Sequence, residues 1–344
     1  MSAVQMTGNS VPLRSRPARS LIAVAVLAAI IVVLASIHAG IGARPVRPAT
    51  LLEAIFAFDT NNFEHQILWK LRFARLAAAL LVGAALGVAG LLLQSLLRNP
   101  LGEPHILGLN AGASLAAVVT SSLPFLANGL ARPLVAALGA GVLFALVMAL
   151  ASAGRAGMTM LKVTFCGIAL SALASSLTSA ILILDEETLQ DMRLWLAGDL
   201  AGIGYDMIGA ALPPIIAGML LAFLIAPRLN ALAVGDAAAT GLGVSVRSTR
   251  FIGLAATALL CGASVSIAGP IGFIGLIVPH AARWLSGGDL RLALPLSAMT
   301  GAALLLAADI AARVLTSPHE LATGIMTAII GAPVFIVAAS RYFR

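Results

Sequence analysis

The chain has 344 residues, of which 60% are hydrophobic and only 10% are charged, and its formal net charge is +7. A soluble domain usually carries about 25% charged residues, so this composition suits lipid as the solvent better than water. The positive charge does not indicate nucleic-acid binding, because the basic residues lie between apolar runs and form no stripe. Continuous apolar runs of about 20 residues, which do not alternate as barrel strands would, predict membrane-spanning helices instead.

The N-terminal segment combines a basic tail with an apolar run. The uncharged run 21–37 follows a stretch with three arginines and no acidic residue (Arg14, Arg16 and Arg19). A cleaved signal peptide is one interpretation, but residues 38–42 form a poor small-x-small cleavage site. We therefore expect an uncleaved first span, preceded by a cytoplasmic tail of residues 1–19.

Ten crossings of the membrane fit the apolar pattern, within a single transmembrane domain of residues 20–341. We expect them near 20–38, 70–97, 105–122, 132–153, 159–184, 206–226, 247–267, 272–284, 292–312 and 321–341. The uncharged stretch 251–282 is too long for one helix and too short for two full ones, and Gly269-Pro270 interrupts it. Irregular backbone at membrane depth is tolerated only inside protein or along a cavity, so residues 268–280 are a candidate element of a transport path.

The distribution of lysine and arginine predicts the orientation. With the N-terminus inside, thirteen of the 21 basic residues lie on cytoplasmic segments and eight lie outside. This excess agrees with the positive-inside rule. An even number of crossings then places both the N- and the C-terminus in the cytoplasm.

Small residues follow one face of the second predicted span. Gly83, Gly87 and Gly90 have the spacing that lets helix backbones approach closely in lipid. We expect them to pack against other helices of the same chain, and a dimerisation face is the alternative.

Two cytoplasmic segments are candidates for a functional role beyond joining the spans. In the loop 98–104, two prolines prevent a continuous helix, so the loop is either a tight turn or a gate into which Asn99 and Leu101 project. The segment 229–243 is short, mildly apolar and punctuated by glycine. We expect one or two short helices outside the bilayer there, lying either in the headgroups or in the groove of a cytoplasmic partner.

Ionisable residues near the outer ends of spans are a third group of candidates. Asp309 and Arg313 are four residues apart and can pair along one helix face. Arg72 and Arg75 lie together near the outer end of the second span. They are either anchors at the interface or a docking site for an acidic partner.

Catalytic signatures are absent from the sequence. There is no H-E-x-x-H motif, and neither lysine (Lys70, Lys162) follows a glycine as a Walker A loop requires. Cys166 and Cys261 fall inside predicted spans, which favours buried apolar residues over a disulfide or a metal site. No acidic residue falls near the middle of a predicted span, so ion-coupled transport has no evident carrier of charge. If the chain moves a solute against its concentration gradient, another subunit or an ion gradient has to drive the transport.

Three motifs carry a resemblance to a known family. They are RNPLGEP at 98–104 with LGLNAGA at 107–113, GFIGLIVPHAAR at 272–283, and TGIMTAIIGAPVF at 323–335. In this order and register they resemble the FecCD-type permeases, which import ferric siderophores, haem and vitamin B12. The likeness extends from about residue 50 to residue 340.

The resemblance implies an all-α fold of ten spans, the permease fold of type II ABC importers in the bacterial inner membrane. It implies three kinds of partner: a second, identical permease subunit, two cytoplasmic ATPases that hold ATP and magnesium, and a periplasmic binding protein. The chain itself would bind no cofactor and catalyse no reaction. Asn99 and Leu101 match cytoplasmic gate positions, and Arg72, Arg75 and Arg313 match arginines that dock the binding protein. The family's coupling helices, which contact the ATPase, match positions within 229–243 (Leu229, Asn230, Leu232, Gly235, Asp236, Gly241, Leu242 and Gly243).

The chain departs from the family pattern at three places. Phe73-Ala74 stands where a proline often separates the outer arginines, Glu320 is not followed by proline, and Ala237 replaces a second acidic residue after Asp236. The first two departures concern docking geometry and the third concerns the contact with the ATPase. The resemblance ranks a ferric siderophore first as cargo, haem second and vitamin B12 third, with an ion-coupled secondary transporter as the rival mechanism.

Overall fold

The computed structural model describes residues 17–42, 46–123, 132–153, 159–316 and 319–342, and all regular structure in these ranges is helical. Ten helices correspond one by one to the ten predicted crossings. They are α1 (Pro17–Gly40), α4 (Ala74–Leu97), α5 (Leu109–Ser122), α7 (Arg132–Ser152), α8 (Met160–Leu184), α10 (Tyr205–Val234), α12 (Val246–Ala268), α13 (Ile274–Ser286), α14 (Leu290–Val314) and α15 (Thr323–Tyr342). Seven spans of the described chain are long and apolar enough to cross a membrane unaided, and the helices α5, α13 and α15 are shorter.

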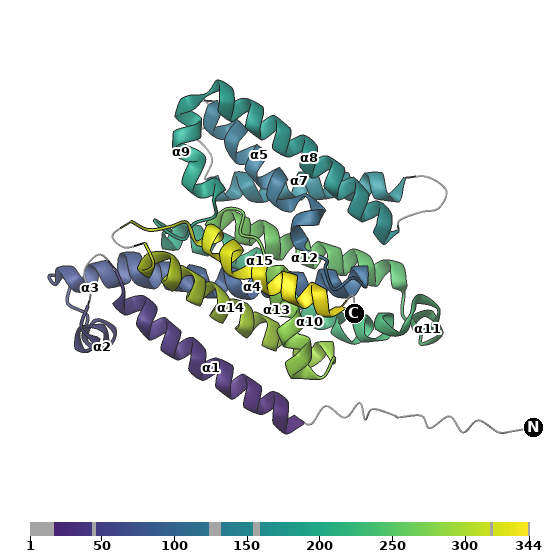
Figure 1. Cartoon of the computed structure of the whole chain (residues 1–344), viewed down its shortest axis with the longest axis horizontal. Coiled ribbons are helices and arrows are strands. Elements are labelled where there is room, and N and C mark those ends of the chain that lie inside the picture. The colour runs from purple at the N-terminus through teal and green to yellow at the C-terminus, as the bar shows by residue number, and fades with distance from the viewer. Residues whose placement is uncertain (1–16, 43–45, 124–131, 154–158, 317–318, 343–344) are drawn as a thin grey trace, which may run out of the picture.

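The smaller helices lie at the two ends of this bundle. They are α2 (Pro48–Phe56), α3 (Phe63–Ile67), η1 (Leu68–Phe73), η2 (Pro104–Leu107), α9 (Glu186–Leu196) and α11 (Asp236–Gly241). Figure 1 shows α2, α3 and α9 at one end, which we call the α9 end. The start of α1, the helix α11 and the last turn of α15 lie at the opposite end, the α11 end.

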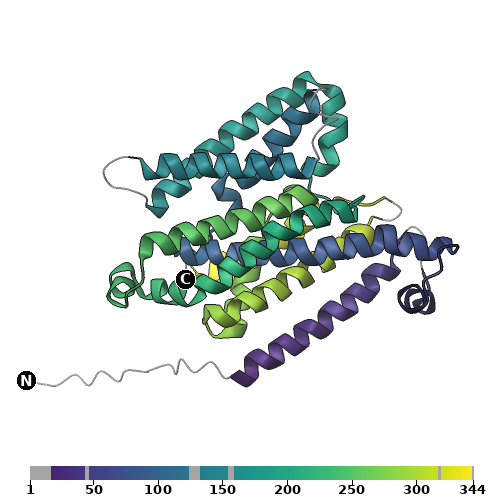
Figure 2. The ribbon, with the colours of Figure 1, turned by 180° about the vertical axis from the view of Figure 1, so that it is seen from behind.

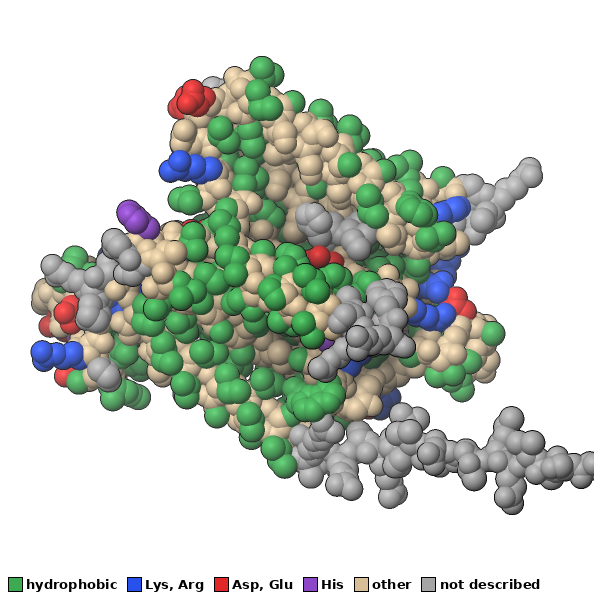
Figure 3. All heavy atoms as spheres, viewed as in Figure 1, with side chains coloured by type: hydrophobic (Ala, Val, Ile, Leu, Met, Phe, Trp, Pro, Cys, Tyr) green, Lys and Arg blue, Asp and Glu red, His purple; other side chains and the backbone are tan. Residues whose placement is uncertain are grey.

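The long helices form a central group with a second group beside it. The helix α4 packs against α12, α13 and α14, while α5, α7 and α8 lie together along one side. Seen from behind, α10 and α12 cross beside α4, and α1 runs along the opposite edge (Figure 2). Charged side chains gather mainly at the two ends, and the face between them is largely hydrophobic (Figure 3). This is the surface expected of a bundle that crosses a bilayer lengthwise.

The glycines of α4 allow its close contacts with the rest of the chain, as expected. A Cβ atom on Gly83 would lie 2.5 Å from the carbonyl oxygen of Gly301, and one on Gly90 would lie 2.0 Å from that of Gly275. The hydroxyl of Ser297 donates to the carbonyl of Gly87 at 2.8 Å. All three glycines of the stripe are therefore used inside the chain, and the alternative of a dimerisation face is wrong.

The predicted break in the stretch 251–282 is confirmed. The helix α12 ends at Ala268 and α13 begins at Ile274, so five residues of irregular backbone separate them. Gly269 adopts φ +67 within a crowded site, where a Cβ would lie 2.0 Å from the carbonyl oxygen of Trp195. Phe273 also has a positive φ of 68°, which a bulky residue adopts only where its surroundings impose it.

The end of α10 differs from the expectation. The span expected near 206–226 continues through Pro227 to Val234. Leu229 and Leu232 are only 2% and 3% exposed, because they pack into the core of the chain. They are therefore not residues of a separate helix outside the bilayer, and only Asp236–Gly241 forms one.

Candidate functional site

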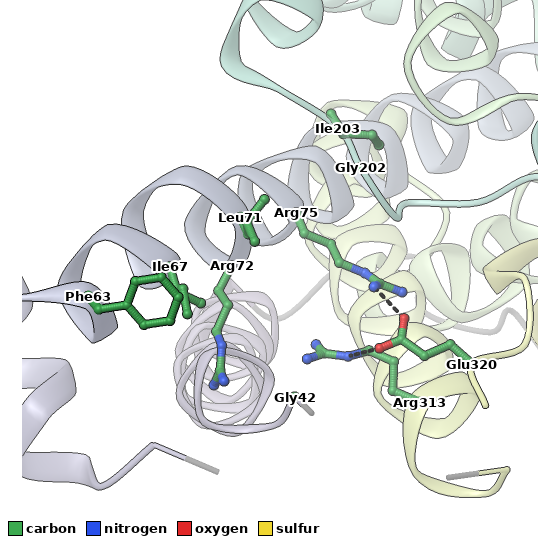
Figure 4. Close-up of a pocket in the computed structure, with 10 residues that line it drawn as sticks. All are labelled: Gly42, Phe63, Ile67, Leu71, Arg72, Arg75, Gly202, Ile203, Arg313 and Glu320. Carbon is green, nitrogen blue, oxygen red and sulfur yellow. Dashed lines mark hydrogen bonds and ion pairs between the residues drawn. The ribbon is translucent and has the colours of Figure 1, made fainter. Parts of the chain in front are cut away.

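The three predicted docking arginines converge at the α9 end, although they come from distant parts of the sequence. Arg72 lies on η1 and Arg75 on α4, while Arg313 lies on the last turn of α14. All three line a cavity of about 460 Å³ together with Glu320. In Figure 4, Arg75 and Arg313 point toward Glu320, whereas Arg72 points toward Gly42.

Asp309 is the buried centre of this cluster. Its side chain is fully inaccessible, and it accepts hydrogen bonds from Arg75 at 2.9 and 3.0 Å and from the hydroxyl of Thr323 at 2.6 Å. Nε2 of His38, on α1, lies 2.8 Å from the same carboxylate. The helices α1, α4, α14 and α15 therefore meet at one carboxylate, which compensates the charge of a mostly buried arginine.

The expected pairing of Asp309 with Arg313 along one helix face does not form. Arg313 instead donates to the carbonyl oxygens of His38 and Ile41. Arg72 donates to those of Ala39, at 2.7 Å, and Gly40, at 2.9 Å. The two arginines thus supply donors to the last carbonyls of α1, which have no partners within the helix, and they oppose its C-terminal dipole.

Two further carboxylates belong to the cluster. Glu320 accepts from Arg75 at 2.7 Å and lies 3.7 Å from Arg313, and it is 41% exposed. Asp199 lies 3.9 Å from Arg75, in the loop after α9. Burial raises the pKa of the Asp199 carboxyl, while hydrogen bonds from the backbone and the charge of Arg75 oppose that rise. Glu320 is therefore the most accessible partner of the arginines.

A second cluster joins the predicted coupling segment to the predicted gate at the α11 end. The guanidinium of Arg98 donates to Asp236 Oδ1 and, at 2.6 Å, to the carbonyl of Leu232. Arg250, on α12, donates to both oxygens of Asp236 at 2.9 and 3.1 Å. One half-exposed carboxylate of α11 is thus held from two directions.

The other predicted coupling residues divide into packed and open positions. Asn230 donates to Asp289 at 2.7 Å and accepts from the backbone N–H of Leu290, so it ties α10 to the start of α14. Leu242 is 71% exposed, and its glycine neighbours are exposed as well (Gly241 and Gly243). Gly235 has φ +135 and forms the joint between α10 and α11. The accessible part of the segment is therefore α11 and the turn after it.

The two predicted gate residues have different surroundings. Asn99 is exposed, and its side-chain oxygen accepts the backbone N–H of Leu101 at 3.0 Å. Asn99 therefore shapes a turn of the loop in addition to any contact with a cargo. Leu101 is partly buried and has no polar role.

Several polar residues of these clusters escaped the sequence analysis. His38 stands in an apolar span, where a lone histidine carries no specific signal, and Glu320 was noted only for the residue that follows it. Arg98 was part of a motif but had no role assigned. The partners at Asp309, Arg75 and Asp236 lie 271, 245 and 138 residues away in the chain, so no local spacing indicates them.

The chain is similar in sequence and in fold to known permeases. Ferric enterobactin transport system permease protein FepD of Escherichia coli (strain K12) is 38% identical, over 94% of this chain and 96% of the relative. Fe(3+) dicitrate transport system permease protein FecD of the same organism is 40% identical, over 88% of this chain and 92% of the relative. A solved structure, described as an inward-facing conformation of a metal-chelate type ABC transporter, superposes with a TM-score of 0.81 at 29% identity. It covers 93% of this chain and 99% of the solved chain.

The fold is therefore that of a membrane-spanning permease of an ABC transporter. Residues 22–341 match the model of the FecCD transport family. The chain belongs to the FecCD transport family, as the three motifs predicted.

Proposed function

We propose that this chain forms the membrane path of an ATP-driven importer of a ferric chelate, with a ferric siderophore as the first candidate. The observation that carries the proposal is membership in a family whose relatives are named for ferric enterobactin and ferric dicitrate transport. These cargoes differ chemically, and their common feature is a chelated ferric ion. Haem and vitamin B12 remain the alternatives within the same mechanism.

The ATPase activity that drives the importer would belong to another chain. The sequence has no Walker A loop, so ATP and magnesium would be held by two cytoplasmic ATPase subunits. The exposed helix α11 and Leu242 are the surface offered to them. A second copy of this permease would complete the path, and the largely exposed apolar helix α8 is a candidate for that contact. The chain itself would carry no catalytic group.

The α9 end would face a periplasmic binding protein. In this orientation both termini and α11 lie in the cytoplasm of a bacterium and the chain spans its inner membrane, in agreement with the positive-inside count. Arg75 and Arg313 share the half-exposed carboxylate of Glu320. Acidic side chains of the binding protein would compete with Glu320 for these arginines, while Arg72 would hold α1 in place.

The path itself would select weakly. The apolar spans of the chain carry few charged residues away from their ends, so a path lined by them would be poor in charge. A bulky chelate crosses such a lining without being trapped by strong ion pairs. Choice of cargo would then rest with the binding protein.

Uptake into proteoliposomes tests the proposal. The permease, its co-purifying ATPase and the binding protein are reconstituted, and accumulation of radiolabelled ferric enterobactin, ferric citrate, haem and cobalamin is measured. We expect one ferric chelate to accumulate only when ATP is present on the side of the membrane that the ATPase subunits face. Accumulation driven by an ion gradient, without any ATPase, would instead establish the secondary transporter, and uptake of cobalamin alone would reject the iron assignment.

A charge-removing variant tests the docking surface. Glu320→Gln frees Arg75 and Arg313 for an outside carboxylate, so we expect the binding protein to bind about two- to fivefold more tightly, the scale of one half-exposed ion pair. Glu187→Gln removes an exposed charge from α9 at the same end and serves as the control. Weaker or unchanged binding of Glu320→Gln would show that the arginines do not receive the binding protein.

A further inference from the structure

The loop that carries the predicted gate residues is a compact turn on the end of α4. Arg98 ends the helix in a left-handed conformation with φ 51°, and its N–H donates to the carbonyl of Gln94. The N–H of Gly102 donates to the carbonyl of Asn99 at 3.0 Å. The side-chain oxygen of Asn99 also accepts the backbone N–H of Leu101 at 3.0 Å, so two hydrogen bonds close the turn internally. The loop is therefore expected to move as a unit.

One end of this turn is attached to α11. Arg98 bonds to the carbonyl of Leu232, in the last turn of α10, and to the carboxylate of Asp236, in the first turn of α11. The joint between these two helices is Gly235, whose φ of +135 suits glycine and around which no atom lies within 4 Å of a Cβ position. Arg98 thus spans the point at which α11 is free to turn relative to α10.

The other end of the turn is attached to the broken helix. Glu103 Oε1 accepts the backbone N–H of Phe273 at 2.8 Å, directly before α13 begins. Phe273 has a left-handed backbone, and its ring packs where a Cβ on Gly331 of α15 would lie. The loop from Arg98 to Glu103 therefore connects the only accessible helix of the coupling segment with the irregular backbone inside the bundle.

Asp236 does not need Arg98 to keep α11 in place. Arg250 donates to both of its oxygens, and Arg250 is 18% exposed while Arg98 is 39% exposed. The two arginines contact the same carboxylate but lead to different elements. Arg250 fastens α11 to the rigid helix α12, and Arg98 fastens it to the loop.

We propose that the Arg98–Asp236 ion pair transmits a movement of α11 to the gate loop, and through Glu103 to the start of α13. The inference rests on the proposed function, in which α11 meets an ATPase. Arg98 is then a positioning residue, which contacts neither ATP nor cargo. A displacement of α11 about Gly235 displaces the guanidinium of Arg98. Because the turn moves as a unit, Asn99, Leu101 and Glu103 are displaced with it.

The test compares arginines that share one partner. Arg98→Gln, Arg98→Lys and Arg250→Gln permeases are purified with their ATPase, and the ratio of radiolabelled ferric chelate imported to ATP hydrolysed is measured with the binding protein present. In each variant, a Leu101→Cys thiol reports the gate through its rate of labelling by a membrane-impermeant maleimide, with and without ATP.

We expect Arg98→Gln to keep the ATPase bound and hydrolysing while the import ratio falls about fivefold or more, the lower range of coupling between two sites. Its thiol should lose the response to ATP. Arg98→Lys, which keeps the charge, should recover part of the ratio, and Arg250→Gln, which leaves the link from α11 to the loop intact, should lower the ratio and the thiol response less than Arg98→Gln.

Two results would overturn the inference. One is an Arg98→Gln variant with a wild-type import ratio and thiol response. The other is an equal loss in Arg98→Gln and Arg250→Gln, because the carboxylate would then merely hold α11 in position. A wild-type complex that imports no ferric chelate with ATP would contradict the proposed function instead, and it is recognised before any variant is compared.

Discussion

The buried carboxylate at the α9 end provides a quantitative test of the structure. Asp309→Asn keeps the shape of the side chain and removes its charge. The wild-type carboxylate is fully inaccessible and meets Arg75, His38 and Thr323, and Arg75 is itself only 12% exposed. Removing one partner of a buried ion pair costs about 3–5 kcal/mol, because the remaining charge keeps no compensation.

Glu320→Gln is the matched control, since it removes a carboxylate from the same arginine. Glu320 is 41% exposed, so water replaces most of what it contributes, and its loss costs about 0–1 kcal/mol. At about 2–4 °C for each kcal/mol, the melting temperature of Asp309→Asn should fall by roughly 10 °C while that of Glu320→Gln changes little.

Thermal unfolding in detergent, followed by the fraction of protein that remains monodisperse, measures the difference. Equal melting temperatures for the two variants would refute the assignment of Asp309 as the buried centre of the cluster. A loss in Glu320→Gln that exceeds the loss in Asp309→Asn would refute it as well.

Two other predictions concern the close packing and the broken helix. Gly90→Ala places a Cβ about 1.4 Å inside the 3.4 Å at which ordinary contact with the carbonyl of Gly275 begins, so we expect a loss of about 1–3 kcal/mol in stability in detergent. Gly209→Ala, where nothing lies within 4 Å, should be neutral or slightly stabilising, and equal effects of the two would contradict the packing described for α4. Glu103→Ala should speed hydrogen exchange of the Phe273 amide, whereas Glu103→Gln should not, because an amide oxygen still accepts that hydrogen bond. Equal exchange in the alanine variant and the wild type would show that the bond protects nothing.

The number and the order of the spans were predictable because each depends on its own stretch of chain. Lipid selects apolar runs of a given length, and Gly269-Pro270 interrupts the stretch 251–282 as expected. The end predicted near residue 226 was wrong, because α10 continues through Pro227 to Val234, and Leu229 and Leu232 pack into the core there. Local rules predict the elements, and packing then moves their ends.

The partners of the charged residues were not predictable. Asp309 has Arg313 one helical turn away, yet it pairs with Arg75 and contacts His38 and Thr323, while Arg313 turns to the end of α1. Burial decides this choice, because the carbonyl oxygens without partners at the C-terminal end of α1 compete with Asp309 for the same arginine. The packing of the whole bundle determines which groups are buried together. The spacing of residues in the sequence does not indicate these pairs.

The contacts at the C-terminal end of α1 are completed only late in the synthesis of the chain. This helix is synthesised before the other described helices, but two of the residues that contact its C-terminal end, Asp309 and Arg313, lie 271 and 275 residues after His38. At about 5–20 residues per second, translation of that interval takes on the order of 10 to 50 seconds. During this time the C-terminal end of α1 lacks two of its partners, so water or lipid headgroups have to bind these polar groups until α14 is made.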